Sequence, residues 1–155
     1  SGVPKNDSGT NDRSIARHPV HRHRMTTGEG GRPSRTDWTV EKKFGEQAAL
    51  VRCRIHTGRT HQIRVHAAYA GHPVAGDAKY GDAEANAALG KFGLSRMFLH
   101  ASSVSFEWPR GGTVSLSAPL PPDLAAVIDA LASAPRTRGV RGPRVPRRGG
   151  RSPAR

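Results

Sequence analysis

Cysteine, acidic residues and long apolar runs are all scarce in this sequence of 155 residues. The single cysteine, Cys53, excludes an internal disulfide and a metal site built from several thiolates. No apolar run approaches the length that crosses a bilayer, and the first residues lack the pattern of a secretory signal peptide. We therefore expect a soluble, cytoplasmic protein without a membrane partner.

The shortage of acid leaves a strongly basic chain, with 25 Lys and Arg against 12 Asp and Glu and a formal net charge of +13. Such a charge is typical of proteins that bind nucleic acid. Residues 135–155 contain eight Arg and no acid, and they have too few apolar residues to offset the entropy lost on ordering. We predict a loop and basic arm over residues 1–36, a folded part over 37–133 and a disordered Arg-rich tail over 134–155.

Alternation of apolar and polar residues predicts two β-hairpins. Residues 37–44 and 48–56 alternate on either side of a reversal at Gly45 and Glu46. Residues 98–109 and 113–119 flank a second reversal in the same way. We expect Trp38, Val40 and Phe44 to share one face of their strand. Four aromatic residues are expected in the core: Trp38, Phe44, Phe106 and Trp108.

Two helices follow from other patterns. Thr60 can cap a helix from His61 to about Ala70, with Gly71 as its left-handed end and with Ile63 and Ala67 packed on the sheet. Apolar residues at helical spacing predict a second helix over residues 122–132. Residues 1–14 read as a loop, and residues 71–95 as a loop with one helical turn at most. The sum is an α+β fold, mostly antiparallel sheet with flanking helices.

The stretch TGRTHQIRVH, residues 57–66, concentrates cationic and polar side chains at the start of the first helix. Free N–H groups at a helix N-terminus attract anions, and arginine offers a planar fork that suits phosphate or carboxylate. The stretch therefore suits an anion site. A basic surface helix with solvated charges explains it equally well, whereas a metal site is disfavoured because His61 and His66 are poorly spaced for two ligands.

A longer stretch, TGRTHQIRVHAAYAGHPVAGDAKYG, resembles the third signature of RluA-type pseudouridine synthases. Four further segments follow the order of that family: IARHPVHRHRM, TDWTVEKKFGEQAALVRCRIH, RMFLHASSVSFEWP and SAPLPPDL. The resemblance covers about residues 8 to 132. It implies the second half of a catalytic domain that isomerises uridine to pseudouridine in structured ribosomal or transfer RNA, with no cofactor and no metal.

The resemblance also assigns roles to individual residues. In the family a catalytic aspartate lies in an H-R-L-D motif, a tyrosine from a second motif packs on the target base, and an arginine of the third signature holds the aspartate ionised. That arginine corresponds to Arg64, the expected catalytic residue here. The expected RNA contacts are Arg59, Thr60, His61, Gln62, Arg17, His18, Arg22, Arg24 and Lys79. For Arg59, His61 and Gln62 the alternative is a contact that positions other residues of the site.

Neither upstream motif occurs in this sequence. We therefore expect a C-terminal segment of a synthase, inactive by itself. A non-catalytic RNA-binding module is the alternative, and a DNA-binding protein is a third possibility. Asp77 is the strongest candidate for a replacement carboxylate, but an aspartate between glycine-bearing turns more often accepts hydrogen bonds from its own backbone.

Overall fold

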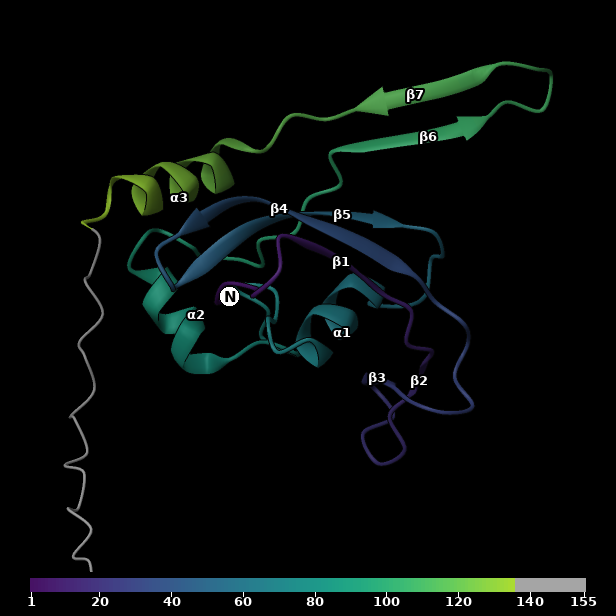
Figure 1. Ribbon diagram of the computed structural model, residues 1–155, viewed down its shortest axis with the longest axis horizontal. Helices are drawn as coiled ribbons and strands as arrows, with labels where there is room; N and C mark the ends of the chain where they lie inside the picture. Colours follow the sequence, from purple (N-terminus) through teal and green to yellow (C-terminus); the bar gives the residue numbers. More distant parts are fainter. Residues whose placement is uncertain (136–155) are drawn as a thin grey trace, which may run out of the picture.

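The computed structural model describes residues 1–135, arranged as an α+β fold of three antiparallel sheets and three helices (Figure 1). β1 (Ser8–Asn11), β4 (Thr36–Phe44) and β5 (Ala48–Ile55) form the central sheet. β2 (Ile15–Arg17) pairs with β3 (Met25–Thr27), and β6 (Ser103–Glu107) pairs with β7 (Thr113–Ser117). The helices are α1 (Gln62–Tyr69), α2 (Ala83–Gly90) and α3 (Pro122–Ser133).

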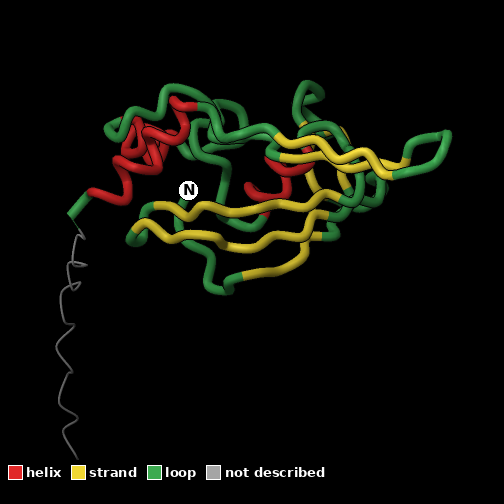
Figure 2. The backbone as a smooth tube through the Cα atoms, turned by 90° about the horizontal axis from the view of Figure 1, so that it is seen from above, coloured by secondary structure: helices red, strands yellow, loops and turns green. Residues whose placement is uncertain are grey.

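This architecture confirms the predicted fold class and both predicted hairpins. The helices lie to one side of the central sheet (Figure 2). None of the helices in residues 1–135 is long and apolar enough to span a membrane. The predicted disordered tail, residues 134–155, lies outside the described part of the chain from residue 136 onward.

The β4–β5 hairpin turns over three residues between Phe44 and Ala48, with Gly45 in the left-handed region at φ 57°. A β-bulge between Val40 and Lys42 shifts the pairing by one residue. Phe44 therefore pairs with Ala48, whereas Trp38 pairs with Cys53, and these two partners point to opposite sides of β5. The expectation that Phe44 shares a face with Trp38 was wrong, because alternation in the sequence does not reveal a bulge.

β1 corrects the expectation of a loop over residues 1–14. It pairs antiparallel with β4, and the Thr10 hydroxyl donates to Asp37 Oδ1 at 2.7 Å. Gly9 lies opposite Trp38, where an added Cβ would come within 2.7 Å of the indole ring. The strand is polar and short, so backbone pairing and this close ring contact hold it in place rather than an apolar pattern.

The hydrophobic core lies where α2 and α3 meet the β4–β5 hairpin. Phe44, Ala48 and Leu89 are its buried centre. Partly buried side chains from β5, the loops and α3 pack around it: Leu50, Ala75, Leu94, Ile128 and Leu131. The core residue Leu89 belongs to α2, which is longer than the single turn expected there, because the Asp82 side chain caps it by accepting from Ala85 N–H at 2.7 Å.

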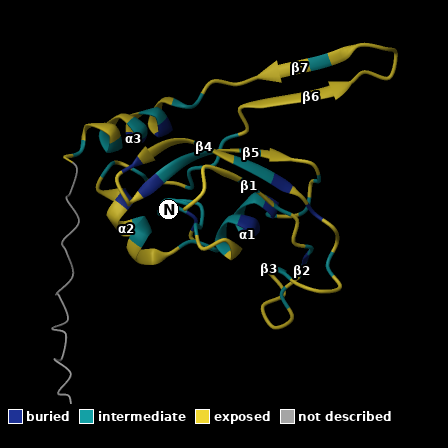
Figure 3. Cartoon of the chain, in the orientation of Figure 1, coloured by how far each residue is buried: buried dark blue, intermediate teal, exposed yellow. Residues whose placement is uncertain are grey.

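The β6–β7 hairpin extends away from the rest of the fold (Figures 1 and 3). Its register places Val104 opposite Leu116 and Phe106 opposite Val114, so one face of the ribbon is apolar. Phe106 and Trp108 are 42% and 51% exposed, which contradicts their assignment to the core. Within residues 1–135 the two strands pair only with each other, and their aromatic side chains remain largely open to solvent.

Candidate active site

α1 begins directly after the cationic turn, but Thr60 does not cap it as expected. His61 occupies the N-cap position with φ 56° and ψ 26°, and no side chain of the described residues caps the helix. Gln62 braces the turn instead, because its Oε1 accepts from Thr57 Oγ1 at 2.7 Å and from Arg59 N–H at 3.1 Å. The predicted left-handed residue after the helix is confirmed at Gly71, where φ is 79°.

The side of α1 that packs on the fold is mostly polar rather than apolar. Gln62, Val65 and His66 are buried, whereas Ile63 and Ala67 are only partly covered, contrary to expectation. Gln62 Nε2 donates to Thr36 Oγ1 at 3.0 Å, and His66 Nδ1 lies 2.9 Å from the same oxygen. These contacts fix the helix on β4 and leave Gln62 4% exposed, which favours a positioning role over direct RNA contact.

Arg64 projects from the first turn of α1 to the loop before α2 and pairs with Asp77. Its Nε donates to Asp77 Oδ2 at 2.7 Å, and its Nη2 donates to Oδ1 at 2.8 Å. The arginine side chain is 17% exposed and the aspartate side chain 0%. Nη1 has no hydrogen-bond partner among residues 1–135, and no fully buried side-chain nitrogen or oxygen there lacks one, so Nη1 is not fully buried.

Asp77 accepts two further hydrogen bonds from the backbone that directly follows it, as the sequence predicted. Lys79 N–H and Tyr80 N–H donate to Oδ1 at 2.8 and 3.1 Å. Burial alone would raise the pKa of Asp77, but the hydrogen bonds from Arg64, Tyr80 and Lys79 outweigh it and lower the pKa to about 2. Asp77 is therefore an ionised anchor for Arg64, a role that sequence reasoning missed.

Tyr80 joins several of the predicted site residues. Its hydroxyl lies 2.9 Å from His61 Nδ1 and accepts from Met25 N–H at 2.9 Å. Three cationic groups lie over its ring, with Arg64 at 4.9 Å, Arg24 at 5.5 Å and Lys79 at 5.8 Å from the centroid. The three-residue spacing of Asp77 and Tyr80 allows the Tyr80 N–H to donate to the carboxylate. That spacing was the sequence signal that could have placed Tyr80 in the site.

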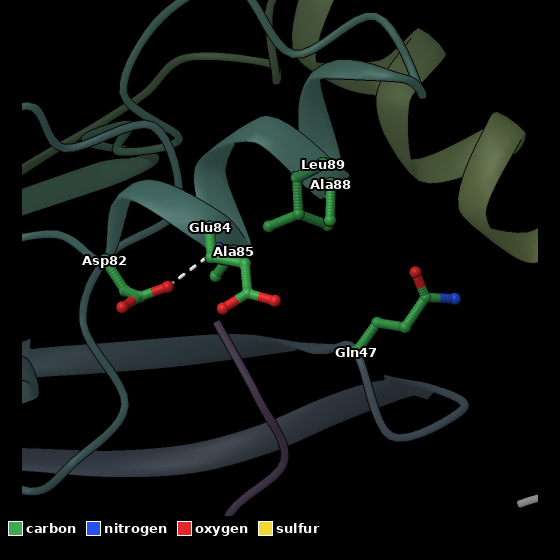
Figure 4. A pocket seen from close by; sticks show the side chains of 6 residues that line it. All are labelled: Gln47, Asp82, Glu84, Ala85, Ala88 and Leu89. Carbon is green, nitrogen blue, oxygen red and sulfur yellow. Dashed lines mark hydrogen bonds between the residues drawn. The ribbon is translucent and has the colours of Figure 1, made fainter. Parts of the chain in front are cut away.

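A pocket of about 360 Å³ opens between α1, the end of β5 and the segment before β6. Its lining combines cationic and apolar groups: Ile55, Gly58, Arg59, His61, Gln62, Ile63, Arg64, Met97 and Leu99. A second pocket, between α2 and the β4–β5 turn, holds the acidic side chains of Asp82 and Glu84 and no predicted site residue (Figure 4). The first pocket is therefore the candidate site.

The other predicted RNA contacts are divided between two places. Arg59 lines the pocket and donates from Nε to Pro33 O at 3.0 Å, while Lys79 donates from Nζ to His23 O beside it. Arg17, His18 and Arg22 lie in the β2 end and the β2–β3 loop, where His18 Nδ1 accepts from His21 N–H at 3.0 Å. That loop forms a second basic surface, which approaches the site through Arg24 over the Tyr80 ring and through the contact of His23 O with Lys79.

Comparison with known proteins identifies the family of the chain. The family model described as RNA pseudouridylate synthase matches residues 3–69. The chain is 42% identical over 125 residues to ribosomal large subunit pseudouridine synthase C of Pasteurella multocida, covering 76% of this chain and 38% of that protein. It is also 42% identical over 130 residues to ribosomal large subunit pseudouridine synthase D of Nitrosomonas europaea, covering 82% of this chain and 38% of that protein.

A solved structure gives the same answer for the fold. Human RNA pseudouridylate synthase domain containing 1 superposes with a TM-score of 0.66 and 28% identity, covering 86% of this chain and 63% of that chain. The chain belongs to the RNA pseudouridylate synthase family, of the RluA type that its signature indicated. It spans 38% of the length of each of the two curated relatives described above.

Proposed function

We propose that this chain carries the arginine side of the active site of an RNA pseudouridine synthase. The reaction is an isomerisation of uridine: the bond from ribose C1′ to uracil N1 breaks and a bond to C5 forms. C5 loses a proton, N1 gains one, and no cofactor is consumed. The names of the relatives favour large-subunit ribosomal RNA over transfer RNA as the substrate.

The observation that carries this proposal is the state of the Arg64 guanidinium. Asp77 holds Nε and Nη2, so the plane of the group is fixed, while Nη1 has no partner among residues 1–135 and Arg64 lines the pocket. A fixed guanidinium with one free N–H₂ group suits a second carboxylate, which it would keep ionised. That carboxylate is the aspartate expected from the family's H-R-L-D motif, which this sequence does not contain.

The surroundings of Arg64 suit RNA. Arg24, Arg59 and Lys79 lie around the same pocket or the Tyr80 ring, and Asp77 is the one acidic side chain that contacts this group within residues 1–135. Cationic side chains at a cleft attract the phosphate backbone and draw a nucleotide toward it. Apolar lining from Ile63, Met97 and Leu99 suits an extruded base, since a target base must leave its stack before it can react.

The test uses the gene in its source cells, where the protein has its natural length. Disrupting the gene should remove pseudouridine from one or a few positions of ribosomal RNA, mapped by chemical modification and primer extension. Restoring the intact gene should return the modification, whereas the Arg64→Ala gene should not. Arg96→Ala is the matched control, because it removes an arginine that pairs with an aspartate on the surface.

Two outcomes would contradict different parts of the proposal. If disruption leaves every pseudouridine of ribosomal and transfer RNA in place, the synthase assignment is wrong. The alternative, an RNA-binding module without catalysis, would then gain support if the chain still bound RNA. If Arg64→Ala restores the modification as well as the intact gene does, the enzyme assignment holds and the role of Arg64 is wrong.

A further inference from the structure

His61 has an unusual backbone conformation. Among residues 1–135 it is the one non-glycine residue with a positive φ, 56°, in the left-handed region. A side chain at such a position is strained, and a strained conformation persists only where its surroundings hold it. Glycine would adopt this backbone more easily, so the imidazole at position 61 calls for an explanation that backbone geometry does not supply.

The imidazole is fixed by Tyr80. Its Nδ1 lies 2.9 Å from the Tyr80 hydroxyl, and that hydroxyl already accepts from Met25 N–H. If the hydroxyl proton points at Nδ1, each donor in the chain of contacts has an acceptor. If Nδ1 carried the proton, the hydroxyl proton would have no partner within the described residues. The network therefore favours the form of His61 that carries its proton on Nε2.

The surroundings also favour a neutral ring. Partial burial lowers the pKa of His61, and the nearby charges of Arg64 and Lys79 lower it further, against an opposing effect of Asp77. Nε2 has no hydrogen-bond partner in residues 1–135, and because no fully buried side-chain nitrogen there is unpaired, Nε2 is not fully buried. His61 lines the same pocket as Arg64, beside Ile63 and Met97.

A neutral N–H donor in a partly apolar pocket suits an uncharged acceptor rather than a phosphate. We propose that His61 is a base-recognition residue, which donates its Nε2–H to a carbonyl oxygen of the uracil that enters this pocket. The assignment rests on the proposed function. It separates His61 from the arginines and lysine around it, whose charges suit the RNA backbone.

The first experiment examines the ring without RNA. Nitrogen-15 NMR of the 155-residue chain with labelled histidine reports which ring nitrogen carries a proton. We expect a neutral His61 ring with its proton on Nε2 at pH 7, and we expect Tyr80→Phe to return the ring to a mixture of both forms. A charged ring, or a proton held on Nδ1, would overturn the assignment.

The second experiment measures binding of a short oligouridylate and of the same oligonucleotide with abasic sites in place of its uridines. His61→Gly should weaken binding of the oligouridylate about three- to tenfold, the effect of one lost hydrogen bond, and leave binding of the abasic RNA unchanged. The thermal midpoint should stay the same or rise, because glycine relieves the backbone strain. His72→Ala is the control, since His72 contacts Ser1 O rather than the pocket.

The possible failures point to different errors. Equal weakening of both RNAs would show that His61 serves the backbone, and would overturn base recognition alone. Unchanged binding of both RNAs by the glycine variant would overturn it as well. If the unaltered chain binds neither RNA at low salt, the proposed RNA-binding role fails, and base recognition fails with it.

Discussion

Two arginine–aspartate pairs in this molecule have nearly the same geometry and very different surroundings. Arg64 reaches Asp77 with hydrogen bonds of 2.7 and 2.8 Å, and Arg96 reaches Asp123 with bonds of 2.6 and 3.1 Å. The first pair is 17% and 0% exposed, and the second is 44% and 51% exposed. The geometry of the two pairs therefore does not show which one contributes more to stability. Their exposure to water does.

The buried pair also belongs to a larger set of contacts. Asp77 accepts from the Lys79 and Tyr80 backbone, and Arg64 lies over the Tyr80 ring. Removing Asp77 leaves the Arg64 guanidinium and both backbone N–H groups without their acceptor, in a place that water reaches poorly. For the exposed pair, water replaces whichever partner is lost. This contrast sets the expected size of the effects below.

The largest effect is expected from Asp77→Ala. The change leaves Arg64 without its counter-charge and leaves two backbone N–H groups without their acceptor. Removing one partner of a buried ion pair typically costs about 3–5 kcal/mol, so the free energy of unfolding of the 155-residue chain should fall by about that amount. Urea titration followed by circular dichroism measures it.

The control for this change is Asp82→Ala. Asp82 also accepts a backbone hydrogen bond, from Ala85 N–H, but at an exposed helix N-cap. Loss of an N-cap costs about 1 kcal/mol. If the two variants are equally stable, burial of the Arg64 pair contributes less than argued.

Sequence reasoning predicted the two members of the buried pair separately, but not their contact. It placed Arg64 at an anion site and predicted that Asp77 would accept from its own backbone, which the structure confirms. It did not predict that the two residues pair, because a loop of unknown path separates them. Their contact depends on where that loop returns to α1, which no local pattern specifies.

In the rest of the fold, too, local sequence patterns predicted some features and missed those that depend on distant segments. Alternation and helical spacing predicted β4, β5, the β6–β7 hairpin and α3, since apolar periodicity is a local property. They missed the bulge after Val40 and the polar strand β1, because both depend on backbone pairing between distant segments. They also placed Trp108 in a core, although apolar character does not specify whether another element covers a strand.

Acidification should produce the next largest effect. The pKa of Asp77 is lowered from its ordinary 3.8 to about 2, so the folded state binds its proton more weakly than the unfolded chain. The stability this provides is complete above about pH 4 and is lost as the pH falls to about 2. Its size is on the order of 2 kcal/mol. Urea midpoints measured between pH 5 and 2 should fall, and Asp77→Asn should flatten that fall.

Asp37 provides a second carboxylate that titrates in the same range, so it is the required comparison. Hydrogen bonds from Thr10, Arg35 and His56 lower its pKa to about 2, although it lies at the surface. Asp37→Asn should change the acid dependence less than Asp77→Asn, because water screens the exposed group. An equal or larger change would contradict the claim that burial separates the two sites.

A smaller effect is expected from Arg64→Lys. Lysine keeps the positive charge but cannot form the two parallel hydrogen bonds to Asp77. Loss of one hydrogen bond to a charged group should lower the free energy of unfolding by about 1.5 kcal/mol. In cells, the gene with this change should restore pseudouridine poorly, since lysine leaves no planar group for the second carboxylate. A fully active lysine variant would show that charge alone suffices at this position.

The smallest effect is expected from Arg96→Ala, which completes the comparison. Asp123 lies in the first turn of α3, where the helix N-terminus stabilises its charge without help from Arg96. Urea titration should give no measurable change at physiological salt, because exposed ion pairs are screened and their partners are readily solvated. Raising the salt concentration should change the free energy of unfolding of the unaltered chain and of the variant by the same amount. A loss comparable to that of Arg64→Lys would mean that Arg96 positions α3 on the core, and exposure would then be a poor guide to which pair matters.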